Sequence, residues 1–386
     1  MKISKLQTGL CFACLVIFIT APAFSVQKYQ DKLEKAESRL RGIFEKKEYN
    51  PKSFRGQWLD DSSGYTVTED TDDSGKKVRV LYDVRGKRTI PGDNEKRNKN
   101  KSEKISPNGK YEIYTEKGNL HVRDLDSKKS VQLTRSKEDS GISYGQASWS
   151  PDGKLIVFVR SDYSQVRQRN VLVPGDPSYP GVKKIRFARI GETIPSLRIG
   201  VVDAEGKQIR WLAIPEPAEG FYLGQVSWAC NSHEVLVEKL SRFRDRRNFL
   251  LADINTGTVK CIFGEHDPTW VVASYRKNSG LDWIRGGKEF IVVSEKDGWR
   301  HAYIYSRQGK ELSLLTPGKF DIIQKSIVDE KGGYYYFYAS PDNGTQRYLY
   351  RVKLKGKAKP QLVTPQDQPG THSYDFSPDA KWAFHT

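Results

Sequence analysis

Two different spacings of apolar residues divide the chain. In the segment Tyr29–Lys47 the apolar residues recur every three or four positions, at Leu33, Ala36, Leu40 and Ile43. This spacing places them on one face of a helix. After this segment the spacing shortens to two, and short β-rich runs alternate with Gly, Asn, Asp and Pro until the end. The pattern predicts one amphipathic helix followed by an all-β region.

A turn motif recurs through the β region. An aromatic or apolar residue precedes Ser-Pro-Asp-Gly or a weaker variant of it, and the copies begin at Ile105, Trp149, Trp228, Trp283 and Phe376. Pro presets φ and Gly supplies a positive φ, so each copy reverses the chain tightly. The copies delimit units of about 40–50 residues with four short strands, which is the propeller period. One such unit cannot bury both of its apolar faces, so the units must stack around an axis.

The number of units sets the expected architecture. Each of the five motif copies marks the start of a unit. A further unit at Phe54–Ile90 and another near Ile327–Asp329 bring the number of units to seven. We expect a β-propeller of seven or eight four-stranded antiparallel blades, whose last blade is incomplete. One long gap between starts holds an insertion, Ser164–Thr193. A pair of β-sandwiches is the alternative, but sandwiches lack this repeat.

The start of the chain has the features of an export signal. Lys2 and Lys5 precede the apolar run Leu10–Ile19. The small residues Ala21 and Ala23 follow it as an A-x-A site, and Ala23 with Ser25 is the alternative. A charged start, a short apolar run and small residues at the exit are typical of a secretory signal peptide. The run is short for a membrane span; an uncleaved anchor or a buried helix are the alternatives. The predicted regions are a signal peptide at 1–25, a helical region at 26–49 and a propeller at 50–386.

Composition and charge exclude several classes of protein. Aromatic residues make up 11% of the chain, enough for a real core, so global disorder is excluded. Lys and Arg number 64 against 47 Asp and Glu. This excess serves solubility, or attracts nucleic acid, anionic lipid or an acidic wall polymer. The cations are spread along the chain, and their densest block, Lys87–Lys104, contains no nucleic-acid motif.

Cysteine and histidine give no sign of a metal site. Cys230 and Cys261 remain after the signal segment, and the repeat places them at opposite edges of one sheet. We therefore expect free thiols, although a disulfide is permitted outside the cytosol. The histidines show no metal-ligand spacing. The sequence predicts no metal and no cofactor.

Several motifs go beyond a generic propeller. They are Asn50–Trp58, Arg186–Pro195, Asp267–Val271, Ser294–His301 and Gly370–Asp379. In this order they closely resemble the N-terminal propeller of the dipeptidyl-peptidase IV family, in the prolyl oligopeptidase clan of serine peptidases. The resemblance covers roughly residues 50–386, and the block Ser-Glu-Lys-Asp-Gly-Trp-Arg-His at Ser294–His301 is its most specific motif.

Members of this family join the propeller to a C-terminal α/β-hydrolase domain with a Ser–Asp–His triad. That domain carries its serine in a Gly-x-Ser-x-Gly elbow between a strand and a helix. Here Gly141–Gly145 fits the spacing loosely around Ser143, but it lies in a polar loop. We expect no catalytic residue in this chain, which ends at Thr386 before such a domain. The chain alone is therefore expected to be inactive.

The resemblance also implies substrate-binding positions. Family exopeptidases carry an acidic pair that binds the substrate N-terminus; the matching place holds Glu138-Asp139, which we interpret as a solvated turn. An aromatic–arginine pair facing the substrate cavity is matched by Tyr275-Arg276, where the Arg could clamp a peptide carbonyl. We interpret Trp299 as a core residue, and Arg300 and His301 as residues whose side chains bond to neighbouring blades.

These expectations define the function to be tested. We expect the substrate-gating propeller of a dipeptidyl-peptidase IV-like serine peptidase involved in proteolysis, truncated before its catalytic domain. The alternative is an exported stand-alone propeller that binds peptide or an anionic wall polymer. The expected partners are a peptide substrate and a hydrolase domain in trans or an oligomer, without nucleic acid. We expect export to the periplasm, the medium or the cell surface, with no membrane span after cleavage.

Overall fold

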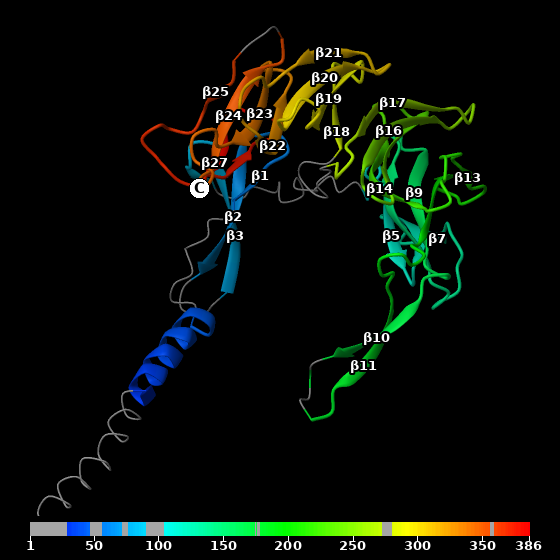
Figure 1. The fold of residues 1–386 in the computed structure, drawn as a ribbon, viewed down its shortest axis with the longest axis horizontal. Helices are drawn as coiled ribbons and strands as arrows, with labels where there is room; N and C mark the ends of the chain where they lie inside the picture. Colours follow the sequence, from blue (N-terminus) through cyan, green and yellow to red (C-terminus); the bar gives the residue numbers. More distant parts are fainter. Residues whose placement is uncertain are drawn as a thin grey trace, which may run out of the picture. The chain divides into compact units, whose positions relative to one another are not determined.

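The computed structural model describes residues 29–46, 56–71, 76–89, 104–173, 175, 178–271, 280–355 and 359–386. Contacts divide the chain into two compact units, one of residues 1–57 with 67–79 and one of 58–66 with 80–386 (Figure 1). The predicted signal peptide lies outside the described residues. Among the described helical residues, none forms a stretch long and apolar enough to cross a membrane.

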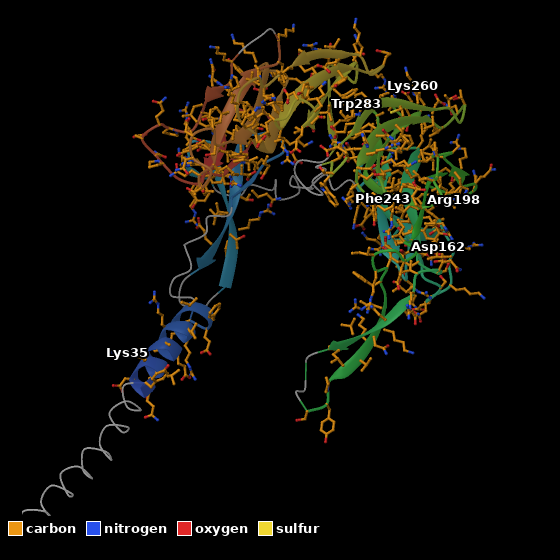
Figure 2. The ribbon with its side chains drawn as sticks, in the orientation of Figure 1. Lys35, Asp162, Arg198, Phe243, Lys260 and Trp283 are labelled. Atoms are coloured by element: carbon orange, nitrogen blue, oxygen red, sulfur yellow. The ribbon has the colours of Figure 1, made fainter. Side chains whose placement is uncertain are left out.

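The predicted helix forms at residues 29–44. An exposed ion pair between Arg41 and Glu37, at 2.8 Å, joins successive turns and contributes about 0.3–0.5 kcal/mol. The apolar residues of the predicted face are exposed, with Leu33 at 62% and Leu40 at 52%. Side chains project from the helix on several sides in Figure 2, where Lys35 is labelled. Its helical form was predictable from sequence, whereas the exposure of its apolar face was not.

Six sheets of three or four strands follow one another in the described chain. The first contains β1 (Gly56–Trp58), β2 (Gly64–Thr71), β3 (Lys76–Asp83) and β4 (Arg88–Thr89). The second contains β5 (Tyr111–Glu116), β6 (Asn119–Asp124) and β7 (Ser130–Gln132). The third contains β8 (Ile142–Trp149), β9 (Leu155–Asp162), β12 (Ser196–Asp203) and β13 (Arg210–Trp211).

The remaining three sheets repeat this meander. The fourth contains β14 (Phe221–Trp228), β15 (Glu234–Ser241), β16 (Arg246–Asp253) and β17 (Val259–His266). The fifth contains β18 (Leu281–Ile284), β19 (Glu289–Ser294), β20 (His301–Ser306) and β21 (Glu311–Leu314). The sixth contains β22 (Ile322–Asp329), β23 (Tyr334–Ala339), β24 (Tyr348–Lys353) and β25 (Gln361–Leu362). Each sheet is a propeller blade.

The predicted turns join the first two strands of a blade. In the third blade the hydroxyl of Ser150 donates to the Asp152 carboxylate (2.6 Å) and accepts the N–H of Leu155 (2.9 Å). Gly153 has a φ of +71°, which a residue with a side chain adopts only with strain. The turn after Phe376 is built in the same way, with Ser377 donating to Asp379 at 2.8 Å. Local sequence chemistry therefore sets these turns.

Neighbouring blades are joined by apolar clusters and by tryptophans. The indole N–H of Trp149 donates to the carbonyl of Lys104 (3.0 Å), and that of Trp228 donates to the carbonyl of Ser148 (3.2 Å). Each bond runs from one blade to the blade before it. Buried aliphatic side chains from two blades surround these rings. The recurrent Trp before the turn is therefore a residue of the blade interface.

The last hairpin packs beside the first blade. It consists of β26 (Tyr374–Phe376) and β27 (Ala383–His385). The indole N–H of Trp58 donates to the carbonyl of Asp375 (3.0 Å), and its ring stacks on Phe384 with centroids 4.2 Å apart. The N–H of Asp379 donates to the hydroxyl of Ser62 at 3.0 Å. The Trp58 bond repeats the blade-to-blade contact seen at Trp149 and Trp228.

The expected number of blades is corrected by the structure. Six sheets of three or four strands are present in the described chain, and the seventh start, at Phe376, yields only the two-stranded sheet of β26 and β27. The sequence motif marks where a blade begins, but it does not report how many strands follow. The second blade also departs from the pattern, because Ile105 contributes only an isolated bridge to Glu112.

The fourth blade contains a buried ionic network. Arg247 on β16 is 1% exposed and lies 2.5 Å from the Glu265 carboxylate on β17 and 3.7 Å from that of Glu238 on β15. It also donates to the carbonyl of Val293 in the next blade, at 2.6 Å. Because three strands and a neighbouring blade share this cation, the network fixes the register of the blade against its neighbour.

Candidate functional site

The structure describes some of the site positions predicted from the sequence and leaves others outside the described residues. Tyr275 and Arg276 lie outside the described residues. Glu138 is exposed and pairs with Lys117 at 3.2 Å, as in a solvated turn. Ser143 lies in strand β8 opposite Ser161, and the next element is strand β9 instead of a helix. The strand–helix elbow of a hydrolase serine is therefore absent around Ser143.

The family-specific block joins the fifth and sixth blades through its backbone. The N–H of Arg300 donates to Asp321 (2.7 Å), and its carbonyl accepts the N–H of Ile322 (2.9 Å). The His301 ring contacts Asp297 in its own hairpin, at 2.9 Å, so its hydrogen bond is local. Trp299 is 39% exposed, which corrects its assignment to the core. Its position at a hairpin end leaves the ring beyond the packed strands.

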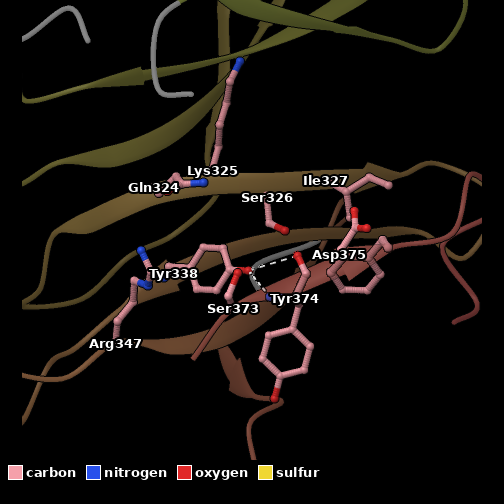
Figure 3. Close-up of a pocket in the computed structure, with 10 residues that line it drawn as sticks. Gln324, Lys325, Ser326, Ile327, Tyr338, Arg347, Ser373, Tyr374 and Asp375 are labelled. Atoms are coloured by element: carbon pink, nitrogen blue, oxygen red, sulfur yellow. Dashed lines mark hydrogen bonds between the residues drawn. The ribbon is translucent and has the colours of Figure 1, made fainter. Parts of the chain in front are cut away.

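A polar cavity of about 470 Å³ lies within the sixth blade and beside the last hairpin. Figure 3 shows side chains from β22, from β23, from Arg347 just before β24, and from the segment of β26 around it. Its lining is Gln324, Lys325, Ser326, Ile327, Tyr338, Arg347, Ser373, Tyr374, Asp375 and Phe376. This volume falls in the range of small-molecule and peptide sites.

Irregular pairing of β22 shapes one wall of this cavity. The register between β22 and β23 shifts twice, between Ile322 and Gln324 and between Lys325 and Val328. Such bulges redirect side chains and are frequent beside functional sites. The ammonium of Lys325 lies 3.0 and 3.1 Å from the two carboxylate oxygens of Asp282 on β18. An ion pair between blades therefore holds Lys325.

Arg347 and Tyr338 form the opposite wall. The Arg347 guanidinium carbon lies 5.0 Å from the centre of the Tyr338 ring, and its Nε donates to the carbonyl of His372 at 3.1 Å. The Tyr338 hydroxyl accepts the N–H of Tyr374 (2.7 Å) and donates to the Tyr374 carbonyl (3.3 Å). Both side chains thus hold the segment that leads into β26, as the dashed lines in Figure 3 indicate for Tyr338.

The geometry leaves the outer end of Arg347 available. No hydrogen bond from its two terminal nitrogens to another described residue is present, since its bond to His372 uses Nε. A planar guanidinium with two parallel N–H groups recognises a carboxylate or carbonyl oxygen. Tyr338 and Arg347 form an aromatic–arginine pair with the same chemistry as the one expected at Tyr275-Arg276, and that expectation stays a prediction. Sequence reasoning missed the pair at Tyr338 and Arg347 because its members are not adjacent: Tyr338 lies in β23 and Arg347 lies just before β24.

A histidine pair lies beside Tyr374 at the start of β26. Nδ1 of His372 lies 2.8 Å from Nε2 of His385, and Nε2 of His372 lies 2.8 Å from the carbonyl of Gln368. A carbonyl only accepts, so Nε2 of His372 carries its proton and His385 donates to Nδ1. Burial, and then the neighbouring His372, lower the pKa of His385 below its ordinary value of 6.5.

A second cavity, of about 610 Å³, lies among the inner strands β5, β8 and β14. The sequence Gly-Gln-x-Ser-Trp occurs at 145–149 and again at 224–228, and both copies carry a bulge. Gln146 has a φ of +47°, whereas Gln225 accepts the N–H of Leu281 in the next blade. This repeated motif could have indicated the cavity from the sequence, but only the turns that follow it were interpreted.

Side chains suited to a metal ion do not gather in the described chain. Across those residues, no group of three or more His, Cys, Asp or Glu could hold an ion. Cys230 and Cys261 are free thiols, and burial raises the pKa of each. A raised thiol pKa lowers the fraction of reactive thiolate.

The sequence matches a family model and several known proteins. A family model described as the dipeptidyl peptidase IV N-terminal region matches residues 63–386. The protein named "Probable dipeptidyl-aminopeptidase B" of Coccidioides posadasii is 28% identical over 313 residues, which cover 72% of this chain and 34% of the relative. The protein of the same name from Aspergillus oryzae is 27% identical over 315 residues, covering 72% and 35%. The chain thus spans about a third of the length of these relatives.

Comparison with solved structures agrees on the fold. The crystal structure of Porphyromonas gingivalis dipeptidyl peptidase 4 matches with a TM-score of 0.66 and 20% identity. The match covers 87% of this chain and 49% of that structure. This match confirms the propeller class predicted from the repeat. The family model confirms the family resemblance predicted from the motifs.

Proposed function

The chain belongs to the family of the dipeptidyl peptidase IV N-terminal region, and from this membership we propose that its propeller binds and admits peptide substrates for a serine peptidase. Arg347 and Tyr338 carry the proposal, because they place an available guanidinium and an aromatic face on one polar cavity. The guanidinium binds a main-chain carbonyl or a terminal carboxylate. The tyrosine ring packs against the adjoining side chain.

Peptide binding by the purified chain tests this proposal. A fluorescent tetrapeptide is titrated against the wild type and Arg347→Gln, and binding is followed by fluorescence polarisation. Loss of one charge-assisted hydrogen bond costs about 1.5–3 kcal/mol, so Arg347→Gln should weaken binding about 10- to 100-fold. Arg347→Lys keeps the charge without the fork and should recover part of the affinity.

The chain supplies a matched control in the neighbouring strand β24. Arg351 also lies over a tyrosine ring, Tyr334, at 4.5 Å, but it does not line the cavity. Arg351→Gln removes the same charge and the same type of contact and should leave peptide affinity unchanged. Urea unfolding of each variant separates a folding defect from a binding defect. Equal affinity of Arg347→Gln and Arg351→Gln would contradict the proposal.

Catalysis is proposed to reside outside this chain, in an α/β-hydrolase domain. A serine peptidase needs a nucleophile, a base and an oxyanion hole in one geometry. A propeller only admits and orients its substrate. The purified chain should therefore fail to cleave X-Pro and X-Ala dipeptide amides and should not react with a fluorophosphonate probe. Turnover with labelling of a single serine would refute this, and Ser143→Ala would then test the first candidate.

Export forms the last part of the proposal. The charged start, the apolar run Leu10–Ile19 and the small residues near Ala23 support cleavage of residues 1–25. Sequencing the mature N-terminus from the native host should give a start between Phe24 and Gln27. Intact Met1 recovered from the cytosol would count against export.

A further inference from the structure

The two ends of each blade carry different connections. In a four-stranded antiparallel meander the first and third turns lie at one end and the second turn lies at the other. In the fourth blade the first turn, 229–233, and the third turn, 254–258, are joined where the N–H of Ile254 donates to the carbonyl of His233 at 2.9 Å. The first and third turns of the second to sixth blades, with the turn of the last hairpin, form what we call the turn face.

Contacts between turns align this face from blade to blade. Three hydrogen bonds link the third blade to the fourth, the fifth to the fourth and the fifth to the sixth. They join the N–H of Asp152 to the hydroxyl of Ser232 (3.1 Å), Nη2 of Arg307 to the carbonyl of Ala229 (3.1 Å) and the N–H of Arg285 to the carboxylate of Glu330 (2.6 Å). A β-carbon on Gly153 in the third blade would lie 3.2 Å from Pro107 in the second. The turn face is therefore continuous over these blades.

Charge differs between the two ends of the blades. The turns of the turn face contain 14 Lys and Arg against 5 Asp and Glu, whereas the connections at the other end contain 11 of each. The second count leaves aside residues 163–195, because β9 pairs directly with β12 and the residues between them form a separate two-stranded sheet. The insertion predicted at Ser164–Thr193 is thus present. The turn face has a formal charge of +9, more than half of the +17 of the whole chain.

Several lysines of the turn face have no anionic partner. Lys110, Lys154, Lys288 and Lys331 are exposed, and none of them forms an ion pair with another described residue. Each directly follows or lies within the first turn of its blade. A lysine ammonium is a compact, strongly hydrated point charge. These four charges are therefore available to an anionic ligand in water.

The cations of the turn face fall into two groups. One group lies in the turns of the second and third blades, and the other lies in the turns of the fifth and sixth. The two turns of the fourth blade, 229–233 and 254–258, contain no Lys, Arg, Asp or Glu. A ligand that contacts both groups must therefore extend across the fourth blade. Two linked contacts raise affinity by up to about 10²–10⁴-fold over either contact alone, which favours a long ligand over a compact anion.

Large apolar side chains are scarce on the turn face. Among the described residues of its turns, Trp382 is the only large apolar residue that is exposed, at 43%. A surface that enters a lipid bilayer combines cations with several exposed apolar residues. A groove for single-stranded nucleic acid has aromatic rings on which successive bases stack. The turn face lacks both features in the described chain, so it suits a ligand that stays hydrated.

We propose that the turn face binds a hydrated anionic polymer, whose carboxylate or phosphate groups contact lysines of both groups at once. Each contact is weak in water, and the length of the polymer supplies the affinity. The candidate peptide cavity is lined by Arg347 and Ser373, which lie in connections at the other end of the blades. The polymer and a peptide therefore bind at separate places, and this inference does not depend on peptide binding.

Titration of the full chain with polymers of defined chemistry tests the inference. Long-chain polygalacturonate carries carboxylates and long-chain polyphosphate carries phosphates, so the tighter of the two identifies the preferred anionic group. Trigalacturonate is too short to join the two groups and should bind about 100-fold more weakly per anionic group than the polymer. Binding should also weaken as salt is raised. Equal affinity of the trimer and the polymer would overturn the proposal in favour of a compact-anion site.

A triple variant removes cations from both groups of the turn face. Each exposed ion pair is worth about a threefold factor in affinity, so Lys110→Gln/Lys154→Gln/Lys288→Gln should bind the preferred polymer about 30-fold more weakly. The slope of log Kd against log salt should fall by about 2, because fewer counterions are released. The substituted side chains are exposed, and thermal unfolding verifies that the variant remains folded.

The connections at the other end supply a matched control. Lys117→Gln/Lys137→Gln/Lys319→Gln removes the same charge from three exposed lysines that lie outside the turn face. Charges beyond about 10 Å are largely screened, so the control should bind within about twofold of the wild type. The basic block Lys87–Lys104 is common to every variant, so a difference between the two triple variants reports the turn face. Equal affinity of these variants would refute the proposal.

Other anionic partners would give different results. Co-sedimentation with phosphatidylglycerol vesicles that the turn-face variant abolishes, without binding to either polymer, would overturn the proposal in favour of a lipid surface. Tighter binding of a single-stranded oligonucleotide than of either polymer, at equal charge, would overturn it in favour of nucleic acid.

Discussion

The fourth blade and the hairpin of β10 (Gln168–Val173) and β11 (Gly181–Arg186) hold cationic residues in opposite environments. In the blade Arg247 is almost completely buried, and two carboxylates and a carbonyl surround its guanidinium. In the hairpin Lys183 and Lys184 are exposed. Desolvating a charge is costly unless partners replace the lost water, so the blade supplies those partners and the hairpin leaves the cations in water.

This difference determines what each cation contributes to stability. Removing Arg247 leaves the buried Glu238 and the mostly buried Glu265 without their cation, so folding itself should suffer. Removing Lys183 or Lys184 changes only water-exposed surface, so folding should be unaffected. Cationic side chains therefore stabilise the fold in one region and leave its stability unchanged in the other.

The largest expected effect comes from breaking the buried network. Arg247→Met should lower the free energy of unfolding by about 3–5 kcal/mol, because it leaves buried carboxylates uncompensated. Urea unfolding followed by tryptophan fluorescence measures it. Its neighbour Arg246 is 67% exposed and lies 3.8 Å from Asp245, so Arg246→Met should change stability by less than about 1 kcal/mol. Similar losses in both variants would show that the network adds nothing.

A smaller effect is expected at the interface between the third and fourth blades. Trp228→Phe keeps most of the buried ring but removes the N–H that donates to Ser148. An unpaired buried carbonyl costs about 1–3 kcal/mol, and thermal unfolding should move accordingly. Trp382, which is 43% exposed, provides the control, since Trp382→Phe should leave the midpoint almost unchanged. An unchanged unfolding midpoint in Trp228→Phe would mean that water replaces the indole N–H as the hydrogen-bond donor to the Ser148 carbonyl.

Substitutions in the hairpin should hardly change the free energy of unfolding. Leu172→Ser/Val182→Ser alters side chains that are already in water, so the free energy of unfolding should change by less than about 0.5 kcal/mol. The same urea experiment compares it with Leu236→Ser, since Leu236 is fully buried in the fourth blade. A marked loss of stability in the hairpin variant would show that Leu172 and Val182 pack in the folded core, and it would contradict the difference between the two regions.

The histidine pair behind β26 should give the smallest effect, and it depends on pH. The pKa of His385 is lower in the folded protein than its ordinary value of 6.5, so the unfolded chain binds the proton first as pH falls. The wild type should therefore lose stability as pH falls below about 6.5, and the loss should level off below the folded pKa.

His385→Gln isolates this contribution. Glutamine can still donate to Nδ1 of His372 but does not titrate near neutral pH. The difference in melting temperature between the wild type and His385→Gln should thus vary between pH 7.5 and pH 5, in the direction that favours the variant at low pH. A difference that is constant across this range would show that His385 does not titrate with folding.

Local chemistry was enough to predict several parts of the molecule. The Ser150–Gly153 turn closes through its own side chains, so four neighbouring residues contain the information. The helix at 29–44 follows from apolar spacing, and the insertion Ser164–Thr193 follows from a break in the repeat. The tryptophans before the turns were also visible, although their bonds to the preceding blade were not.

The sequence by itself determined the repeat, the propeller class and the family, because these rest on turns and alternation over a few residues. Only the tertiary structure decided which distant residues meet: Arg247 with Glu238 and Glu265, and Tyr338 with Arg347. The incomplete last blade at Phe376 was predicted from the sequence, whereas the number of full blades came from the structure. The physical reason is that strand register and blade stacking set these contacts, and both depend on packing summed over many residues.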